Sequence, residues 1–232
     1  MAGNATPCLL EARDLVKRYP SASETVTPLD RLSLEIRQGD FALVFGPSGS
    51  GKTTLLNLLC GIDRPDEGSV SFDGRRVDDS GDKALTLLRR ESLGVIFQGF
   101  ELVPVMSCRE NVEYPLVLKD IARAERRSRI RRMAAALDIE GILDRKPAQV
   151  SGGQRQRVAI CRALVAGYRI VLGDEITGNL DQASAARVYD LLAAMNRDEG
   201  MTFLMVTHNT ALTPYANKVY RLSGGTLAEE AV

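Results

Sequence analysis

The 232-residue chain is long enough for one large domain or one domain with a subdomain, and its 44% apolar and 26% charged residues are typical of a soluble globular protein. Thirty basic side chains balance thirty acidic ones, which excludes a general electrostatic attraction to nucleic acid or to an anionic membrane. No apolar run approaches the roughly 20 residues that span a bilayer. No signal peptide is visible from Met1 to Cys8, and four scattered cysteines are typical of a reducing cytosol.

The first part of the chain is expected to consist mainly of strands. Leu9 to Val16 predicts the first strand, which ends near Tyr19, and a polar, turn-rich loop from Ser21 to Pro28 follows it. Alternation of apolar and polar residues from Leu32 to Ile36 indicates a half-buried strand. The apolar run from Phe41 to Phe45 predicts a buried strand.

A glycine-rich segment, Gly46-Pro47-Ser48-Gly49-Ser50-Gly51-Lys52-Thr53-Thr54, follows that strand and precedes a predicted helix over Leu55 to Cys60. Strand, glycine-rich loop and helix together are typical of a phosphate-binding loop. Its backbone N–H groups form a cradle for phosphate oxygens, and the helix start adds a positive dipole end. Lys52 reaches the β- and γ-phosphates in such a loop, and the Thr53 hydroxyl ligates Mg²⁺. The alternative, a glycine-rich turn with a surface lysine, leaves the flanking strand and helix unexplained.

The middle of the chain is less regular. Ser69 to Phe72 predicts a strand, Lys83 to Arg90 a helix, and Gly94 to Phe97 a short buried strand that ends on Gln98. From Gly99 to Leu118 the pattern loosens, with two prolines and several apolar residues that look exposed.

A strongly basic helix is predicted over Ile121 to Leu137. Its basic residues are Arg123, Arg126, Arg127, Arg129, Arg131 and Arg132. They form either a nucleic-acid patch or a solvated helix face. We favour the solvated face because no aromatic residues alternate with the arginines to stack on bases.

The last third of the chain alternates further helices and strands. The predicted elements are a short helical piece and linker over Ile139–Val150, a helix over Gln154–Ala166, a strand over Ile170–Leu172, a helix over Gln182–Arg197, a strand over Thr202–Val206, and a hairpin from Lys218–Leu222 and Thr226–Ala228. The alternation predicts an α/β fold with a mainly parallel sheet and helices on both faces.

Polar residues stand just past several predicted strand ends: the Gly46–Thr53 loop, Gln98, Asp174, Glu175 and His208. The carboxyl ends of parallel strands form one ligand crevice, so these residues are expected to share a pocket. There, Asp174 holds Mg²⁺ and Glu175 polarises a water aimed at the γ-phosphorus. Gln98 contacts the metal or that water, and His208 bonds the γ-phosphate. Taken singly, each has an ordinary structural explanation as a cap, a solvated side chain or a core histidine.

The segment Ser151-Gly152-Gly153-Gln154 predicts a second anion-binding helix start, with two glycines and a capping serine. One nucleotide needs only one phosphate loop. This second segment is therefore expected to complete a site on another subunit.

In the order and spacing of these motifs, the chain resembles the nucleotide-binding subunit of ABC transporters over essentially its whole length. The matching motifs are Walker A (Gly46–Thr53), the Q-loop (Gln98), the signature (Val150–Gln154), Walker B (Ile170–Asp174) with Glu175 as catalytic glutamate, the D-loop (Asn179–Asp181) and the switch histidine (His208). The resemblance implies a P-loop NTPase core with a mainly parallel sheet, an N-terminal antiparallel β subdomain and a helical subdomain. It implies one domain over 1–232, with a core of 1–97 and 168–232 and a helical subdomain of 98–167.

The same resemblance implies roles for individual residues. The catalytic ones are Lys52, Gln98, Glu175 and His208, and the Mg²⁺ ligands are Thr53, Gln98 and Asp174. The nucleotide contacts are Tyr19, Gly46, Pro47, Ser48, Gly49, Ser50, Gly51, Lys52, Thr53, Thr54, Ser151, Gly152, Gly153, Gln154 and Asp181. Without the resemblance, Tyr19 is better explained as an ordinary edge-strand tyrosine than by stacking on adenine.

Three shorter segments resemble the class of lipoprotein-release and macrolide-export ATPases: Thr177–Asp181, Leu102–Pro104 and Glu110–Val112. Three positions depart from the family pattern. Val150 stands where Leu is usual, and Gly173 and Ile176 stand where Ala and Pro are usual. Ile176 removes a rigid kink after Glu175 and is expected to alter the placement of that carboxylate modestly.

The resemblance implies an ATP- and Mg²⁺-dependent ATPase that dimerises head to tail and drives membrane permease subunits through the Gly99–Tyr114 region, at the cytoplasmic face of the inner membrane. The second ATPase subunit is either the same chain or a related one, and no nucleic acid is involved. A mechanotransmission ATPase that regulates a cell-envelope enzyme stays open. A DNA-repair ATPase is disfavoured because the 53 residues from Gln98 to Ser151 are too few for its coiled coil. A kinase has no use for the second Gly-Gly helix start.

Overall fold

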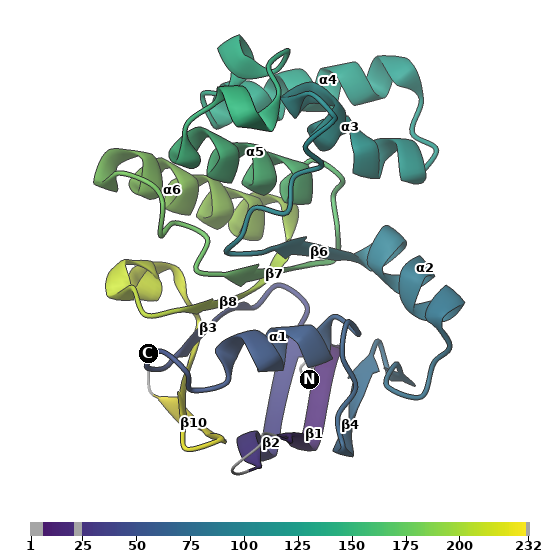
Figure 1. Cartoon of the computed structure of the whole chain (residues 1–232), viewed down its shortest axis with the longest axis vertical. Helices are drawn as coiled ribbons and strands as arrows, with labels where there is room; N and C mark the ends of the chain where they lie inside the picture. The colour runs from purple at the N-terminus through teal and green to yellow at the C-terminus, as the bar shows by residue number, and fades with distance from the viewer. Residues whose placement is uncertain (1–6, 21–24, 231–232) are drawn as a thin grey trace, which may run out of the picture.

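Two sheets and the helices packed on them make up the part of the chain that the computed structural model describes, residues 7–20 and 25–230 (Figure 1). The central sheet has six strands in the order β10-β9-β3-β8-β7-β6. Their bounds are β3 (Phe41–Phe45), β6 (Leu93–Ile96), β7 (Ile170–Asp174), β8 (Thr202–Thr207), β9 (Lys218–Ser223) and β10 (Thr226–Glu230). All neighbours pair in parallel except β9 with β10, which confirms the predicted mainly parallel sheet.

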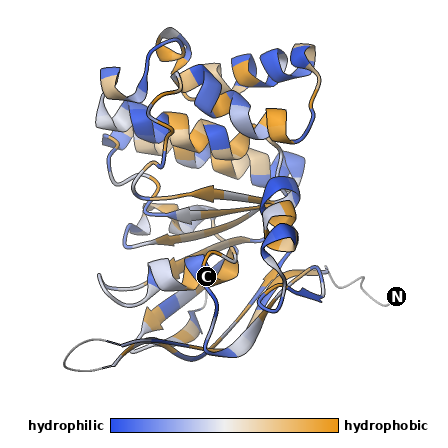
Figure 2. Cartoon of the chain, turned by 45° about the vertical axis from the view of Figure 1, so that its right-hand side comes forward, coloured by the Kyte–Doolittle hydropathy of each residue, from blue (hydrophilic) through white to orange (hydrophobic). Residues whose placement is uncertain are grey.

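The central strands are apolar because layers cover both of their faces. Every residue of β3, β7 and β8 is buried, as parallel strands sandwiched between other layers should be. Phe41 and Leu43 join a core shared with the long helices, while Ala42 and Val44 join a second core on the opposite face. These strands run largely orange through the middle of Figure 2.

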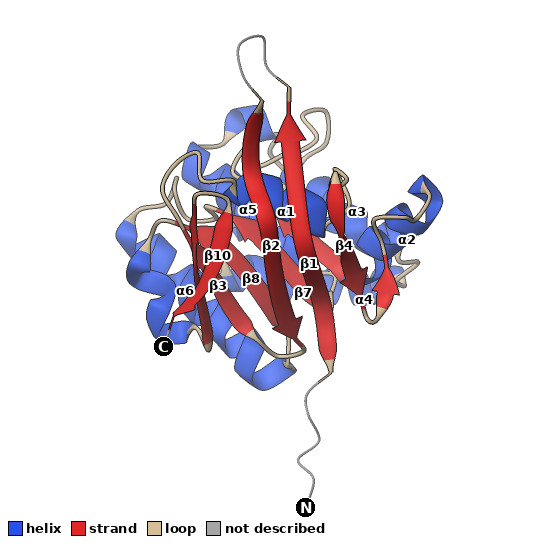
Figure 3. Ribbon diagram, turned by 90° about the horizontal axis from the view of Figure 1, so that it is seen from below, coloured by secondary structure: helices blue, strands red, loops and turns tan. Residues whose placement is uncertain are grey.

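A second sheet, antiparallel and in the order β2-β1-β4-β5, lies against one side of the molecule (Figure 3). Its strands are β1 (Cys8–Tyr19), β2 (Val26–Arg37), β4 (Glu67–Phe72) and β5 (Arg75–Arg76). The predicted antiparallel β subdomain is thereby confirmed. Strand β2 begins before the predicted Leu32, and β1 continues past Val16 to Tyr19, with Lys17 paired to Asp63 at 2.9 Å. The predicted loop over Ser21–Pro28 lies partly outside the described residues.

Helices cover both faces of the central sheet, as predicted (Figure 1). Helix α1 (Lys52–Leu59) packs between the two sheets, while α5 (Gly152–Leu164) and α6 (Gln182–Glu199) cover the opposite face. Helix α2 (Asp82–Ser92) precedes β6.

A further helical layer stands beyond α5. It contains α3 (Cys108–Leu118), α4 (Arg123–Ala136) and the 3₁₀ turns η1 (Glu140–Ile142) and η2 (Pro147–Gln149). Helix α3 corrects the irregular segment expected over Gly99–Leu118, and the 3₁₀ turn η3 (Thr210–Tyr215) was also not predicted. Among the described residues, no helix combines the length and apolarity that a membrane crossing requires.

Candidate functional site

A cleft of about 450 Å³ opens at the carboxyl ends of the central strands. The predicted site residues that line it are Tyr19, Ser48, Gly49, Gly51, Lys52, Thr53, Thr54, Gln98, Asp174, Glu175 and His208. Val26 and Pro28 of β2 complete the wall and were not predicted. The topology brings these residues together because β3, β6, β7 and β8 run parallel and end at one edge.

The glycine-rich loop is shaped as a phosphate cradle. Gly51 has φ of 98°, and a Cβ there would lie 2.5 Å from the carbonyl oxygen of Pro28, so only glycine fits. Helix α1 starts at Lys52, whose Nζ donates to the carbonyl oxygens of Gly46 and Pro47 at 2.8 Å each. The Ser50 hydroxyl is buried and has no hydrogen-bond partner among the described residues. An anion with several oxygens fits this arrangement of an unpaired hydroxyl, an ammonium group and a helix N-terminus.

A hydroxyl and a carboxylate meet beside the cradle. Thr53 Oγ1 donates to Asp174 Oδ2 at 2.7 Å. Burial raises the pKa of Asp174, and the negative Glu175 adds to the rise, although the Thr53 hydrogen bond opposes it. Both oxygens, with Gln98 on the same cleft wall, are the type of ligand that Mg²⁺ accepts. The residues present therefore fit a magnesium ion.

Glu175 is held in an unusual backbone conformation, with φ of 47°. Its carboxylate accepts hydrogen bonds from Thr207 Oγ1 at 3.2 Å and from the backbone N–H of His208 at 3.0 Å. The His208 Nδ1 atom lies 2.7 Å from Glu175 Oε1. Left-handed backbone at a non-glycine residue costs free energy, and such strain concentrates at functional sites. The Glu175 side chain is 12% exposed, whereas the His208 side chain is 74% exposed and faces the open cleft.

Tyr19 lies at the end of β1, where its hydroxyl donates to Asp63 Oδ2 at 2.8 Å. The Lys17 ammonium lies 5.2 Å from the centre of the Tyr19 ring. Burial acts to raise the pKa of Asp63, but hydrogen bonds from Lys17 and Tyr19 outweigh it and hold the pKa below its usual range. Asp63 thereby fixes the aromatic ring at the mouth of the cleft. Sequence reasoning missed Asp63, because it lies in a turn far from Tyr19 along the chain and no local signal marks it.

The second glycine-rich segment lies outside the cleft. The Ser151 hydroxyl accepts from the Gln154 N–H at 3.3 Å, and Gln154 Oε1 accepts from the Ser151 N–H at 2.9 Å, so the two cap α5 reciprocally. A Cβ on Gly153 would lie 3.2 Å from the carbonyl oxygen of Asn179, which places this helix start against the Asn179–Asp181 loop. Asp181 caps α6 by accepting from the Ser184 N–H at 2.9 Å. None of these predicted nucleotide contacts lines the cleft of the same chain.

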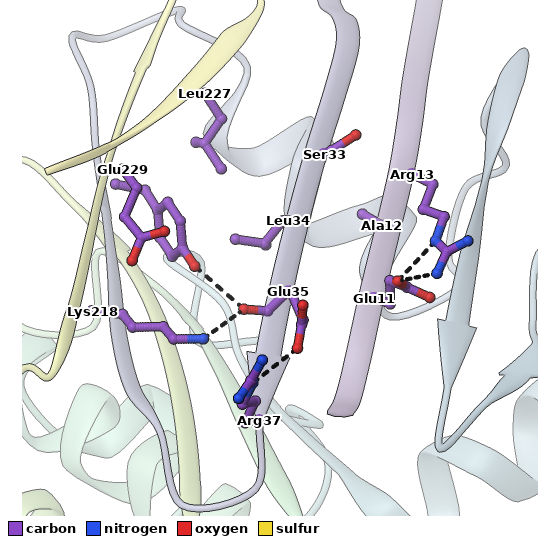
Figure 4. Close-up of a pocket in the computed structure, with 11 residues that line it drawn as sticks. Glu11, Ala12, Arg13, Ser33, Leu34, Glu35, Arg37, Lys218, Leu227 and Glu229 are labelled. Carbon is purple, nitrogen blue, oxygen red and sulfur yellow. Dashed lines mark hydrogen bonds and ion pairs between the residues drawn. The ribbon is translucent and has the colours of Figure 1, made fainter. Parts of the chain in front are cut away.

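A larger hollow of about 670 Å³ lies between β1, β2 and the β9–β10 hairpin (Figure 4). Its basic groups are paired: Arg37 pairs with Glu35, Arg13 pairs with Glu11, and Lys218 pairs with Asp40 beside the hollow. It contains none of the predicted site residues. The smaller cleft, which contains Lys52 of the cradle and the carboxylates of Asp174 and Glu175, is therefore the candidate site.

Comparison with known proteins shows which family has this geometry. Residues 29–178 match the family model described as ABC transporter. The chain belongs to this family. Its relatives include the lipoprotein-releasing system ATP-binding protein LolD of Chromohalobacter salexigens, 40% identical with 100% of both chains covered.

Other members of the ABC transporter family agree with this placement. The macrolide export ATP-binding/permease protein MacB of Marinobacter nauticus is 39% identical over 96% of this chain, which spans about a third (34%) of that longer protein. A solved dimeric structure of MJ0796, a bacterial ABC transporter cassette, has a TM-score of 0.91 at 36% identity, covering 96% of this chain and 98% of that one. The predicted family and fold class are confirmed.

Gly173 and Ile176, which flank Asp174 and Glu175, pack against each other. A Cβ on Gly173 would lie 2.6 Å from Ile176 Cγ2 and 2.4 Å from Met205 Sδ. Ile176 is 3% exposed, so its side chain occupies the space that an alanine at position 173 would need. Glycine at 173 therefore accommodates isoleucine at 176, on either side of Asp174 and Glu175.

Proposed function

We propose that two copies of this chain close head to tail around two ATP molecules, each held between the cradle of one copy and the Ser151–Gln154 segment of the other. The observation that carries this is the split of the predicted contacts. Lys52, Glu175 and His208 share one cleft, while Ser151 and Gly153 lie on another surface of the same chain. A two-fold axis supplies both halves from one sequence.

The chain is an ATP-binding subunit of the ABC transporter family and an ATPase, as the sequence predicted. A structural relative with a TM-score of 0.90 and 35% identity, again MJ0796, was solved as a dimer in a post-hydrolysis state with ADP and Pi. In addition, we propose roles for individual residues, a bound metal ion and the partners of the chain.

In the proposed mechanism, Lys52 and the backbone N–H groups of the cradle bind the phosphates. Thr53 and Asp174, with Gln98 beside them, would hold Mg²⁺, which neutralises phosphate charge when bound. Glu175 takes the proton of the water that attacks the γ-phosphorus. His208, which contacts Glu175 at 2.7 Å, donates to the γ-phosphate once ATP is present. Tyr19, fixed by Asp63, stacks on the adenine.

We propose a core of residues 1–97 and 168–232 and a helical subdomain of residues 98–167. The division is supported by β6, which ends at Ile96, and by the run of helices from α3 to α5 before β7. Gln98 stands at the first junction, so a change at the γ-phosphate reaches the helical layer through this residue.

Membrane permease subunits are the proposed partners, docked on the Gly99–Tyr114 region at the cytoplasmic face of the inner membrane. An apolar groove of about 530 Å³ between α2, α3 and α5 adjoins this region and includes Tyr114, Pro115, Leu118 and Tyr168. Tyr114 is 46% and Leu118 40% exposed, so two large apolar side chains of α3 adjoin one another at the surface beside this groove. The MacB relative combines ATP-binding and permease functions in its name, which supports a membrane partner.

The substitution Glu175→Gln tests the proposal. It removes the general base and keeps the side-chain size, so ATP turnover should fall by about 10²- to 10⁴-fold. ATP affinity should persist, and the variant should accumulate as a dimer in ATP and Mg²⁺, as measured by light scattering after gel filtration.

The parent chain, which hydrolyses its ATP, is the control and should return to monomers. A Glu175→Gln chain that turns over ATP at the parental rate would exclude the assigned base. One that binds ATP and stays monomeric, even with its membrane partner, would exclude the shared site.

A further inference from the structure

An arginine-lined groove of about 580 Å³ lies between α3, α4 and η1, away from the ATP cleft. We call it the arginine groove. It is lined by Arg109 and Glu113 of α3, by Arg123, Arg127 and Arg131 of α4, and by Glu140 of η1. Figure 1 shows these helices at the upper end of the molecule, far from β1 and β2.

The three α4 arginines in the groove have no partner within the described residues. Arg123, Arg127 and Arg131 are exposed and form no hydrogen bond or ion pair there. Spaced four residues apart, they lie on one side of the helix, where like charges repel. Two of their neighbours are paired: Arg126 binds Glu113 at 2.7 Å, and Arg129 binds Glu125 at 2.8 Å. Three of the four α4 arginines that have no partner among the described residues therefore lie on the groove side, and the fourth, Arg132, lies outside it.

The remaining charged groups of the groove do not neutralise these three. Glu113 already binds Arg126, and Arg109 binds Asp144 at 2.8 Å. Glu140 forms no ion pair among the described residues, and it is one carboxylate against three free guanidinium groups. The groove thus carries net positive charge in a concave surface, which concentrates its field.

We infer that the arginine groove binds an acidic segment of the membrane partner, a point that rests on the proposed function. Arg109 and Glu113 lie within the Gly99–Tyr114 region proposed to meet that partner, so a partner on α3 reaches both the apolar groove and this one. Arginines four apart repeat at about 6 Å along the helix. Carboxylates four apart on a helix, or two apart on a strand, have nearly the same repeat.

The shape and chemistry of the groove favour a carboxylate-bearing segment over other anions. A guanidinium fork matches a carboxylate in a bidentate geometry. A bilayer surface is flat, so it fits poorly into a hollow that is lined by three elements. Nucleic acid is disfavoured because the described lining contains no aromatic side chain for base stacking.

The test compares two double variants of the same helix. Arg127→Gln with Arg131→Gln removes two charges from the groove. Arg129→Gln with Arg132→Gln removes two charges from α4 outside the groove. The measured quantity is the binding of each full-length variant to membranes. The membranes are prepared from cells that make the permease subunits and are stripped of peripheral proteins.

The groove variant should bind these membranes about tenfold more weakly, with a weaker salt dependence, while the control variant binds as the parent does. A helical peptide with Glu at every fourth position should compete with the parent, and its Gln analogue should not. ATP turnover of both variants without membranes should stay at the parental level, since none of these arginines lies in the cleft.

Equal binding by the two double variants would overturn the inference. So would equal competition by the Gln peptide, or binding to protein-free phosphatidylglycerol vesicles that shows the same tenfold loss, which would assign the groove to lipid. The proposed function fails separately, through the Glu175→Gln experiment, so the two failures are distinguishable.

Discussion

Asp174 is a buried carboxyl group at the end of β7. Its ionised form is the proposed ligand of Mg²⁺, but the same ionised form lowers the stability of the nucleotide-free protein. Burial raises its pKa, with Glu175 adding to the rise and the Thr53 hydrogen bond opposing it. The folded state therefore holds the proton more tightly than the unfolded chain does. Stability falls as pH rises through the window from the ordinary aspartate pKa, about 3.9, to the raised value. At neutral pH, the ionised carboxylate destabilises the nucleotide-free protein.

The substitution Asp174→Asn should consequently increase the free energy of unfolding at pH 7 without nucleotide, because it removes a buried charge and keeps an acceptor for Thr53. The gain should shrink toward zero as pH falls to the ordinary aspartate pKa, and Mg²⁺-dependent ATP turnover should be lost. Urea unfolding at several pH values measures the effect. Asp181 is the control: its pKa is lowered by hydrogen bonds from Ser184, so Asp181→Asn should not stabilise. A destabilised Asp174→Asn chain at pH 7 would contradict this account.

The Gly173–Ile176 contact leads to a second prediction at the same scale. The substitution Gly173→Ala places a Cβ within 2.6 Å of Ile176 Cγ2, a stiff β-branched side chain. Overpacking of this kind costs about 1–3 kcal/mol. Because Glu175 lies between the two residues with φ of 47°, its carboxylate should shift, lowering kcat more than it changes KM. Denaturant unfolding and steady-state ATPase assays measure both effects.

A double-mutant cycle supplies the control. In an Ile176→Ala background one of the two crowding atoms is gone and only the Sδ atom of Met205, on a flexible side chain, is left, so Gly173→Ala should cost less than in the parent. Additive effects of the two substitutions, on stability and on kcat, would show that the contact does not position Glu175.

At the level of elements, the buried parallel strands were the most predictable part of the structure. The apolar run Phe41–Phe45 coincides with β3, and the residues after β3, β6, β7 and β8 meet in the cleft. The local sequence pattern was enough to predict these strands, because a strand that is buried on both faces is a continuous run of apolar residues. Helix α3 was missed because Pro115 lies inside it, and a proline normally argues against a helix.

The sequence nevertheless contained a signal for α3. Ser107 and Glu110 form a capping box at its start, with Glu110 Oε2 accepting from the Ser107 N–H at 2.7 Å. Contacts between distant segments had no such signal. The Tyr19–Asp63 hydrogen bond and the Gly173–Met205 packing depend on tertiary structure, and only coordinates bring these pairs together.

For the whole molecule, the consequence of a split site is that two defective chains can repair each other. A Lys52→Ala chain lacks the phosphate lysine but keeps its Ser151–Gln154 segment. A Ser151→Arg chain keeps the cradle but presents a bulky cation where its partner's ATP should lie. In a mixed dimer, one site contains both defects and the other contains neither.

Each variant alone should therefore be inactive, and an equal mixture should recover about a quarter of parental turnover if the sites work independently, because half of the dimers are mixed and each has one intact site. ATPase assays on chains mixed before ATP is added measure this. A chain with both substitutions, mixed with the inactive Lys52→Ala chain, should recover no turnover. This mixture controls for the higher total concentration of chains. If the equal mixture forms dimers but stays inactive, the two copies do not complete each other's sites. If the Ser151→Arg chain alone keeps the parental turnover, the Ser151–Gln154 segment acts only as a helix cap.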